Sequence, residues 1–235
     1  VVLSPLLALD EVTVVGAGER AVEVERVVDQ DLGSALLLLD TGAGGLTIRP
    51  SVDAVIDQWL AERQRASIPL IVAHSHGHGD HQAGDHEFRA RPDTQVVGVQ
   101  PADVAAFFGI AEWPNSIVKY DLGDRVLRII PTPGHHPSHI MIYDERTKLL
   151  LSGDALYPGR LYIPSNLLGD FQASTDRVVE FLKGRDVSHI LGAHIEMTRT
   201  PGVDIKLGAS QHPNEHVLEL APEQLVELQA AVRAM

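Results

Sequence analysis

A short stretch of the chain concentrates residue types that bind metal ions. Residues 74–81 read His-Ser-His-Gly-His-Gly-Asp-His, which places four of the twelve histidines and one aspartate in a single window. Neutral imidazole is the commonest side-chain metal ligand in proteins. The apolar run at residues 68–73 comes directly before the window and is typical of a buried strand. The sequence therefore predicts a metal site at the end of a strand.

Three later positions repeat this order of apolar run, glycine and polar side chain. His135 and Asp154 each follow a glycine directly, and His194 follows Gly192 by two residues. Glycine lets a backbone approach a crowded centre because it has no Cβ. We expect these side chains to meet the histidine window at one site.

Within the window, we expect the side chains to alternate as they do in an extended chain. His76, His78 and Asp80 would then converge, while His81 would face the opposite side. One short loop could in this way supply two adjacent metal ions.

The elements that must position these residues form two similar blocks, each rich in strands first and covered by helices later. The first block has predicted strands at residues 11–15, 21–28 and 34–39, a helix at 51–66 with Ser51 as its N-cap, a short helix at 84–90, a strand at 95–99 and a helix that opens at Pro101. The second has strands at 117–120, 125–131, 139–143 and 148–151, a helix at 173–183, a strand at 188–191 and a helix at 222–234. This order predicts two stacked sheets with helices outside, an α/β/β/α arrangement.

The composition is that of a soluble globular protein. The 235 residues are 44% hydrophobic and 22% charged, and no apolar stretch is long enough to span a membrane. No linker or shift in composition divides the chain, so we expect one domain over residues 1–235. The first residues lack a basic start and are interrupted by Pro5, which makes a poor signal peptide. We therefore expect a cytoplasmic protein, with the reservation that residue 1 is valine and upstream sequence can precede it.

The absence of cysteine and the acidity of the chain limit its chemistry. Without cysteine there is no thiolate ligand, so a metal must be held by His, Asp or Glu. A net charge of −13 and the lack of a basic run disfavour nucleic acid as a partner. A metal centre would offset several negative charges locally, so a small anionic substrate stays compatible with this charge.

Together, these motifs resemble those of the metallo-β-lactamase superfamily. The window contains its His-x-His-x-Asp-His signature at residues 76–81, and Thr-Pro-Gly-His follows at 132–135. Leu-Ser-Gly-Asp at 151–154 is similar to the bridging-aspartate motif, Gly-Ala-His at 192–194 to the last ligand motif, and Leu-Leu-Asp-Thr-Gly at 38–42 to the early aspartate turn. The resemblance implies the α/β class and the metallo-β-lactamase-like sandwich of two mixed sheets.

Carried over position by position, the resemblance implies a dinuclear metal site. One ion would be held by His76, His78 and His135, the other by Asp80, His81 and His194, with Asp154 as the bridge. Asp40 would orient the ligand loop through hydrogen bonds without touching a metal. Two Zn²⁺ ions suit this set of nitrogen and oxygen ligands, and iron or manganese would also be compatible.

The implied chemistry is hydrolysis of a small acyl substrate. Two metal ions ~3.5–4 Å apart would hold a bridging hydroxide and polarise the scissile carbonyl. Asp80, beside that nucleophile, would carry its proton to the leaving group. Asp154 stands where dedicated β-lactamases of the superfamily carry cysteine or serine, so a carboxylic ester, a thioester or a lactone is the expected substrate.

Tyr157 follows Asp154 by three residues, as a tyrosine does in the superfamily's acyl-homoserine lactonases, where it is placed to hydrogen-bond the substrate carbonyl. The alternative is a half-buried aromatic residue with its hydroxyl in water. Glyoxalase II-type thioesterases share the ligand set, but Pro158-Gly159-Arg160 matches their next motif only weakly.

Other functions of the same scaffold stay open. A persulfide dioxygenase would need one iron, held by His76, His78, His135 and Asp154, and all four residues are present. Hydrolysis of a β-lactam or a phosphodiester, or a non-catalytic binding role, are further alternatives.

Several residues near these motifs carry no assigned role. We interpret His74 and His136 as lying behind or outside the site, with a place in the pocket lining as the alternative, His139 as structural and His86 as exposed. His212 and His216 are interpreted as parts of a surface turn, with a loop that overhangs the site and shapes substrate choice as the alternative. The apolar residues at 161–163, 167 and 168 would form either a lid or acyl-binding wall, or a loop that folds onto the core or contacts a second copy in a homodimer.

Overall fold

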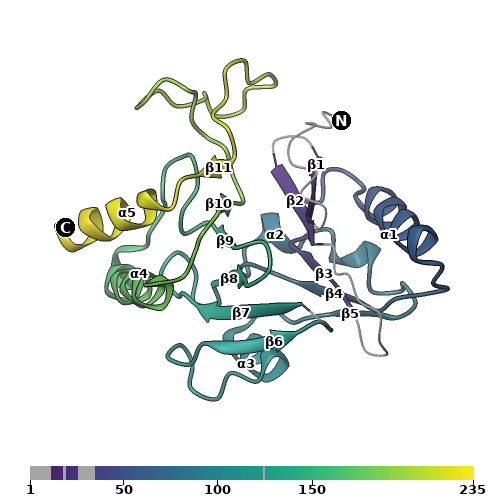
Figure 1. The fold of residues 1–235 in the computed structure, drawn as a ribbon. Coiled ribbons are helices and arrows are strands. Elements are labelled where there is room, and N and C mark those ends of the chain that lie inside the picture. The colour runs from purple at the N-terminus through teal and green to yellow at the C-terminus, as the bar shows by residue number, and fades with distance from the viewer. Residues whose placement is uncertain (1–11, 18–19, 26–34, 124) are drawn as a thin grey trace.

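The computed structural model describes residues 12–17, 20–25, 35–123 and 125–235, and two β-sheets lie at its centre (Figure 1). The first sheet has the strand order β1-β2-β3-β4-β5. Its strands are β1 (Val12–Ala17), β2 (Arg20–Glu25), β3 (Leu36–Leu39), β4 (Leu70–Ala73) and β5 (Thr94–Val96). The pairs β1/β2 and β2/β3 are antiparallel, whereas β3/β4 and β4/β5 are parallel. The sheet is therefore mixed.

The second sheet has the order β11-β10-β9-β8-β7-β6 and is also mixed. Its strands are β6 (Val118–Asp121), β7 (Val126–Pro131), β8 (Ile140–Asp144), β9 (Leu149–Gly153), β10 (His189–Gly192) and β11 (Glu219–Leu220). Only the β9/β10 pair is parallel among these described strands. The crossover between β9 and β10 contains the long helix α4 (Leu168–Leu182), as a parallel connection requires.

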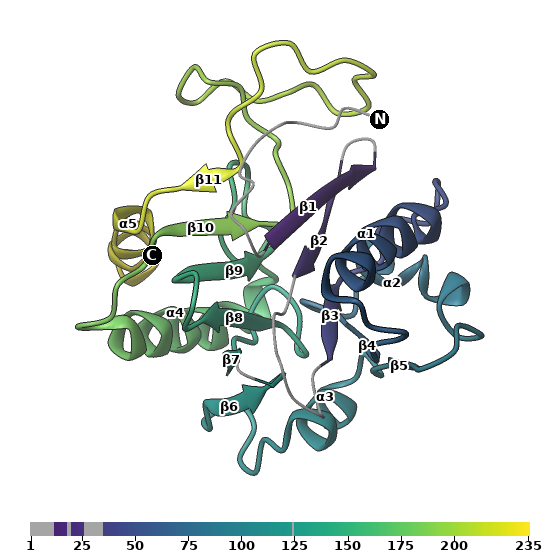
Figure 2. The same ribbon diagram turned by 45° about the vertical axis from the view of Figure 1, so that its right-hand side comes forward.

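Helices cover the outer faces of the two sheets. Helix α1 (Arg49–Arg63) lies on the side of the first sheet, while α4 and α5 (Glu223–Arg233) lie on the opposite side of the molecule, against the second (Figures 1 and 2). Helix α3 (Pro101–Phe108) lies near β6. This is the α/β/β/α sandwich that the sequence predicts.

Two apolar clusters fill the layers of the sandwich. One joins the buried strands β3 and β4 to Ile129 and Ile142, on strands of the second sheet. The neighbouring residues Ile130 and Met141 belong to the other cluster, which packs against α4 and α5. Successive side chains of a strand point to opposite faces. The second sheet is therefore covered on both faces. That residues 1–235 form one domain stays a prediction.

The start of α1 differs from the prediction. The helix begins at Arg49, and Ser51 lies inside it rather than at the N-cap, which Ile48 occupies. Pro50 fits the first turn because its missing N–H would have no partner there. The carboxylate of Glu87 accepts hydrogen bonds from the backbone N–H groups of Ile48 and Arg49, at 3.2 and 3.1 Å. A side chain remote in sequence thus caps the helix, which local sequence signals do not reveal.

Two further predictions need correction, and one strand was not expected. The short helix expected at 84–90 is a 3₁₀ turn, Asp85–Glu87, and the helix expected at 173–183 already begins at Leu168, after the 3₁₀ turn Ser165–Leu167. Strand β11 was not predicted, because two residues are too short to show a periodic pattern. In the part of the chain that the structure describes, none of the helices has the length and apolarity that a membrane crossing requires.

Candidate metal centre

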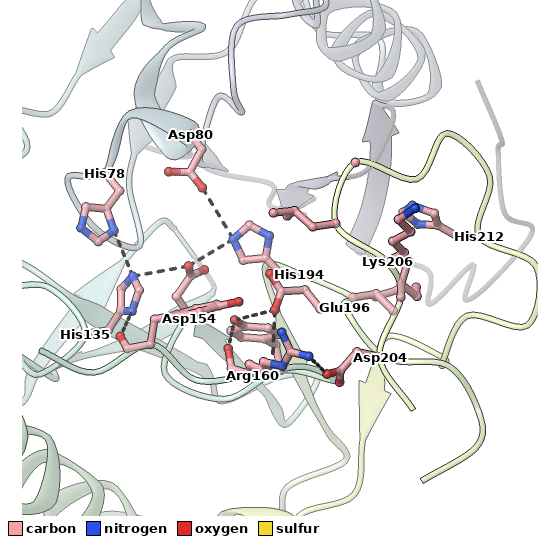
Figure 3. Close-up of a pocket in the computed structure, with 16 residues that line it drawn as sticks. His78, Asp80, His135, Asp154, Arg160, His194, Glu196, Asp204, Lys206 and His212 are labelled. Carbon is pink, nitrogen blue, oxygen red and sulfur yellow. Dashed lines mark hydrogen bonds and ion pairs between the residues drawn. The ribbon is translucent and has the colours of Figure 1, made fainter. Parts of the chain in front are cut away.

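The predicted ligands come from loops that follow β4, β7, β9 and β10, so both sheets contribute to the site. Figure 3 shows part of this arrangement, with His78, His135, Asp154, Asp80 and His194 directed toward one region. The ligand atoms form three overlapping groups, within each of which they lie no more than 4.8 Å apart: His76, His78 and His135; His76, His81 and Asp154; and Asp80, His81 and His194. All seven side chains are thus brought together.

The first group is made of three imidazoles that point at one another. The His78 Nδ1 atom lies 2.9 Å from Nε2 of His76 and 3.0 Å from Nε2 of His135. Tetrahedral zinc with bonds of about 2.0–2.1 Å separates its ligand nitrogens by roughly 3.4 Å. Small rotations of these rings would therefore open the group to the size of a bound ion. The other nitrogen of His135 donates to the Tyr162 carbonyl at 2.7 Å, which leaves Nε2 free to act as a ligand.

The second group lies beside the first, and Asp154 contacts both. Nε2 of His81 is 3.5 Å from the Asp80 carboxylate, and Nε2 of His194 is 3.7 Å from it. Asp154 places Oδ1 3.4 Å from His81 Nε2 and Oδ2 3.1 Å from His194 Nε2. Its Oδ2 atom is also 3.5 Å from Nε2 of His135. The Asp154 carboxylate thus lies between the two groups and contacts residues of both.

The backbone of the window is not extended throughout, which corrects the expectation that His76, His78 and Asp80 share one side. Residues Gly79–Gln82 form the helical turn α2, so Asp80 and His81 occupy successive positions of a helix instead of opposite faces of a strand. Both of these side chains consequently reach the second group, together with His194. One loop still supplies both groups, but a helical turn divides them.

Two buried atoms at the centre of the site support metal binding. Among the described residues, His81 Nε2 and Asp154 Oδ1 are buried without a hydrogen-bond partner. Buried polar atoms are nearly always paired, because an unpaired one loses its hydration without compensation. A cation between the imidazole nitrogen and the carboxylate oxygen would satisfy both atoms. The donor set, five imidazoles and two carboxylates, fits zinc or another transition-metal ion.

The electrostatics of the site set the protonation states of its side chains. Burial lowers the pKa of His76 and His135 below the ordinary value, so both imidazoles are neutral. For Asp154, burial raises the pKa, but the hydrogen bond from His194 and the positive charge of His81 outweigh it and keep the group ionised. Burial likewise opposes the charged form of His81, yet the Asp40 and Asp154 carboxylates raise its pKa to about 10. The two carboxylates thus favour positive charge at His81, which a metal ion would supply.

Asp40 holds the ligand window from behind, as the sequence predicts. One carboxylate oxygen accepts a hydrogen bond from the Ser75 backbone N–H at 2.8 Å. The other accepts from the Ser75 hydroxyl at 2.8 Å and from His81 Nδ1 at 2.9 Å. Because Asp40 holds the proton on Nδ1, Nε2 is the nitrogen of His81 that would give up its proton to bind a metal ion.

A buried network that the sequence analysis missed supports the window from another side. Nε2 of His74 lies 2.8 Å from Oδ1 of Asp85, and the Thr41 hydroxyl donates to the same oxygen at 2.8 Å. The Thr41 backbone N–H donates to the His81 carbonyl at 2.7 Å. His74 therefore lies behind the site rather than in the pocket. Asp85 and Thr41 carried no local signal, because the contacts that define the network join residues 11 to 44 positions apart.

The segment that carries Asp154 is fixed by His139 and by a close approach at Gly153. The Asp154 backbone N–H donates to Nε2 of His139 at 3.2 Å, and the Nδ1 atom of His139 is paired with the Thr132 hydroxyl at 2.7 Å. The Gly153 φ of +52° and the 2.8 Å that would separate an added Cβ from Ser75 Cβ exclude larger side chains there. His139 is thus structural, in agreement with its interpretation.

A pocket of about 350 Å³ opens next to the candidate metal centre. Its lining includes Asp80, Asp154 and His194 on one side and residues Asp204 to Gly208 on another (Figure 3). Tyr157 also lines it, but its hydroxyl donates to the Arg160 carbonyl and lies 3.3 Å from the Glu196 carboxylate, not in water. Burial, then the charge of Glu196, raises the pKa of Tyr157, so the phenol stays protonated and can donate.

The pocket corrects the interpretation of His212 and shows which parts of the apolar segment after Asp154 reach it. His212 lines the pocket, although the sequence favoured a surface turn, whereas His216 is not among the lining residues. The apolar segment after Asp154 divides between its two expected roles: Leu161, Ile163 and Leu168 pack against the core, while Tyr162 lines the pocket. His86 is exposed and pairs with the Ala83 carbonyl.

A comparison with protein families identifies the fold family. Residues 27–194 match the model of the metallo-beta-lactamase superfamily, which is more than half of the chain. The chain belongs to this superfamily. The match ends at His194, the last predicted ligand of this superfamily member.

Curated relatives of this superfamily member include enzymes that act on thioesters by name. The chain is 26% identical to the human acyl-coenzyme A thioesterase MBLAC2, over 76% of the chain and 74% of that protein. It is 31% identical to a hydroxyacylglutathione hydrolase of Rhodospirillum rubrum, but over only 46% of each protein. An uncharacterized protein of Aquifex aeolicus is 29% identical over 80% of the chain and 91% of its own length.

Solved structures of other superfamily members share the fold. A metallo-beta-lactamase from Pontibacter korlensis gives a TM-score of 0.55 at 12% identity, covering 96% of this chain and all of its own. The superfamily protein ST1585 from Sulfolobus tokodaii gives 0.54 at 13% identity, covering 94% and 85%. At these identities the likeness concerns the fold alone.

Proposed function

We propose that the protein is a metal-dependent hydrolase that cleaves a carboxylic ester, a thioester or a lactone of a small molecule, with a thioester as the leading candidate. One observation carries the proposal. Seven imidazole and carboxylate side chains converge in two groups, Asp154 contacts both, and unpaired buried atoms remain between them among the described residues. A site of this kind fits two metal ions, for which we propose zinc.

Metal ions bound there would supply Lewis acidity and an activated water molecule. The chain's own residues would position and protonate the reactants. Burial lowers the pKa of His76 and His135, which keeps both imidazoles neutral, and His135 is also held by its hydrogen bond to the Tyr162 carbonyl. Asp154 stays ionised, so the site carries a fixed negative charge at its centre.

Asp80 is the proposed proton carrier. Its carboxylate lines the pocket, and its side chain is 33% exposed, whereas that of Asp154 is only 7% exposed. Asp80 can therefore meet both the reacting centre and a substrate in the pocket. It would accept a proton from the nucleophile and return it to the leaving group.

Tyr157 is the proposed hydrogen-bond donor to the substrate carbonyl. Its ring centroid lies 5.3 Å from that of His194, and the residue lines the pocket. To reach a substrate, the hydroxyl would exchange its bond with the Arg160 carbonyl for one with the substrate oxygen. Such rearrangement on substrate binding is common among catalytic hydrogen bonds.

The choice of thioester rests on the relatives that carry that activity in their names, at identities of 26% and 31%. The mononuclear iron alternative needs only His76, His78, His135 and Asp154. A single iron there would not use the second group, Asp80, His81 and His194, as ligands. That group therefore favours the dinuclear hydrolase.

The test combines metal analysis with a hydrolysis screen. The purified protein is assayed for zinc, iron and manganese per chain, and for cleavage of thioesters, esters, lactones, phosphodiesters and β-lactams. His78→Gln should abolish activity and reduce the metal content, whereas His86→Gln, an exposed histidine outside the site, should change neither. One iron per chain with oxygen uptake on a persulfide, activity confined to phosphodiesters or β-lactams, or full activity after exhaustive chelation would each reject the proposal.

A further inference from the structure

The loop between β10 and β11, residues 193–218, forms the wall of the pocket that faces the candidate metal centre. In Figures 1 and 2 it extends beyond the edge of the second sheet. Asp204, Lys206 and His212 of this loop line the same pocket as the metal ligands. In Figure 3, Lys206 and His212 lie on the side of the pocket away from His78 and His135.

Backbone hydrogen bonds give the wall a defined shape. The Ile205 N–H donates to the Glu196 carbonyl at 2.8 Å, and the Thr198 N–H donates to the Val203 carbonyl at 2.9 Å, so residues 196–205 form a tight hairpin. An ion pair between Asp204 and Arg160 joins this hairpin to the loop that follows Asp154. Lys206 comes two residues after that ion pair, so its backbone is held in place.

The charges of this wall are paired, with one exception. Asp204 pairs with Arg160, the Glu196 carboxylate accepts a hydrogen bond from the Arg160 backbone N–H at 3.4 Å, and His212 lies 3.6 Å from Glu215. In the part of the chain that the structure describes, Lys206 has no carboxylate or other acceptor near its ammonium group.

This contrasts with the other three lysines of the sequence. Lys119 pairs with Asp121 at 3.1 Å, Lys183 with Glu180, and Lys148 with the Glu145 carbonyl. The chain has 32 acidic residues against 19 lysines and arginines, so a cation without a partner is unusual in it. An unpaired ammonium in the wall of a pocket is free to bind an anion.

We propose that Lys206 binds an anionic group, a phosphate or a carboxylate, on the part of the substrate that lies away from the metal ions. The inference rests on the proposed hydrolase function and adds a determinant of specificity to it. The side chain would select charged acyl substrates over neutral ones with the same scissile bond. It takes no part in bond cleavage, so Lys206 is a substrate-binding residue and not a metal ligand or proton carrier.

The experiment compares matched pairs of substrates that differ only in charge. S-acetyl-4′-phosphopantetheine and S-acetyl-pantetheine differ in one phosphate, and S-acetyl-N-acetylcysteine and its methyl ester differ in one carboxylate. Lys206→Ala should lower kcat/KM about tenfold for the charged member of at least one pair, the lower range for a hydrogen bond to a charged group. It should leave the neutral members within about twofold, and Lys206→Glu should have a larger effect on the charged members.

The matched control is Lys183→Ala, which removes an exposed lysine at the end of α4, paired with Glu180, and should change neither pair. The pair that responds identifies phosphate or carboxylate. An equal loss on charged and neutral substrates, or no preference for charge in the wild type, overturns the role of Lys206. Thermal unfolding of each variant verifies that the exposed substitutions leave the fold intact.

Calorimetry separates this inference from the proposed function. 4′-Phosphopantetheine and pantetheine carry the same thiol and differ by one phosphate, so a difference in their binding reports on that phosphate, and N-acetylcysteine and its methyl ester report on the carboxylate. If the wild type cleaves none of the substrates, the hydrolase proposal fails. Tighter binding of a charged ligand that Lys206→Ala removes would still support the binding role, and equal binding of both members in both pairs would reject it.

Discussion

The substitution Asp40→Asn tests whether hydrogen bonds behind the window control one metal ion. The Asp40 carboxylate accepts three hydrogen bonds, from the Ser75 N–H at 2.8 Å, the Ser75 hydroxyl at 2.8 Å and His81 Nδ1 at 2.9 Å. Asparagine has the same shape but offers one acceptor oxygen and one NH₂ donor. With its oxygen on the Ser75 N–H, its NH₂ group would face His81 Nδ1.

Two donors cannot share a hydrogen bond, so His81 would turn to the other tautomer and carry its proton on Nε2. That nitrogen is the one that lies 3.4 Å from Asp154 and 3.5 Å from Asp80. Loss of such supporting contacts typically lowers metal affinity about 10- to 100-fold. The loss should fall on the ion of Asp80, His81 and His194 and spare the three-histidine group.

The assay is a zinc titration of chelated protein, with metal content measured at several buffered zinc concentrations. The wild type should fill two sites, and the variant should fill one normally and the other only at about 10- to 100-fold higher zinc. Asp53→Asn, on α1 and paired with Arg49 and Arg91, is the control and should behave as the wild type. Unchanged affinity at both sites, or an equal loss at both, would refute the tautomer argument.

Three further predictions follow from the structure. Tyr157→Phe should lower kcat/KM about tenfold, because the hydroxyl would no longer donate to the substrate. Steady-state kinetics measure this effect, and the zinc content of the variant should be unchanged. An unchanged kcat/KM rejects that role. Asp85→Ala removes the carboxylate shared by His74 and Thr41, and it should weaken zinc binding about 10-fold or more, so a titration like that of the wild type would remove Asp85 from the support of the window. Burial raises the pKa of Asp144, but Arg125, its 2.5 Å partner, and hydrogen bonds from Thr147 and Arg146 lower it below 3.8. The stabilisation from Asp144 is therefore fully present above about pH 4 and lost at lower pH. Asp144→Asn should cost about 3–5 kcal/mol at pH 7 and progressively less below pH 4, whereas a pH-independent difference in urea unfolding would contradict the ion pair.

The candidate metal ligands were predictable because coordination limits residue type and position at once. A ligand needs an imidazole or a carboxylate, and the approach of several strand ends to one point favours glycine beside it, as at Gly153 before Asp154. The ligand residue and its glycine lie within a few positions of each other, so the pair can be recognised in the sequence. The sandwich was predictable for a similar reason, since the apolar runs of β3 and β4 are buried throughout.

What the sequence could not reveal depends on contacts between remote residues or on very short elements. The helical turn Gly79–Gln82 spans four residues, too few for a helical period, so the extended-chain reading of Asp80 and His81 was wrong. Glu87 caps α1 from 38 residues away, and Asp85 meets Thr41 across 44. Neither carboxylate differs locally from a solvated surface charge.

The sequence left the role of the pocket wall open, with a surface turn favoured over a loop that overhangs the site. A lysine in a polar loop is ordinarily a surface residue, and nothing near Lys206 in the sequence sets it apart. Its significance comes from the hairpin that closes at Ile205, from the Asp204–Arg160 ion pair, and from the pairing of every other lysine in the described chain. The residues of the candidate metal centre can therefore be recognised from short sequence motifs. The choice of substrate, in contrast, depends on which charged side chains have no partner in the fold. Such side chains can be identified only from the three-dimensional structure.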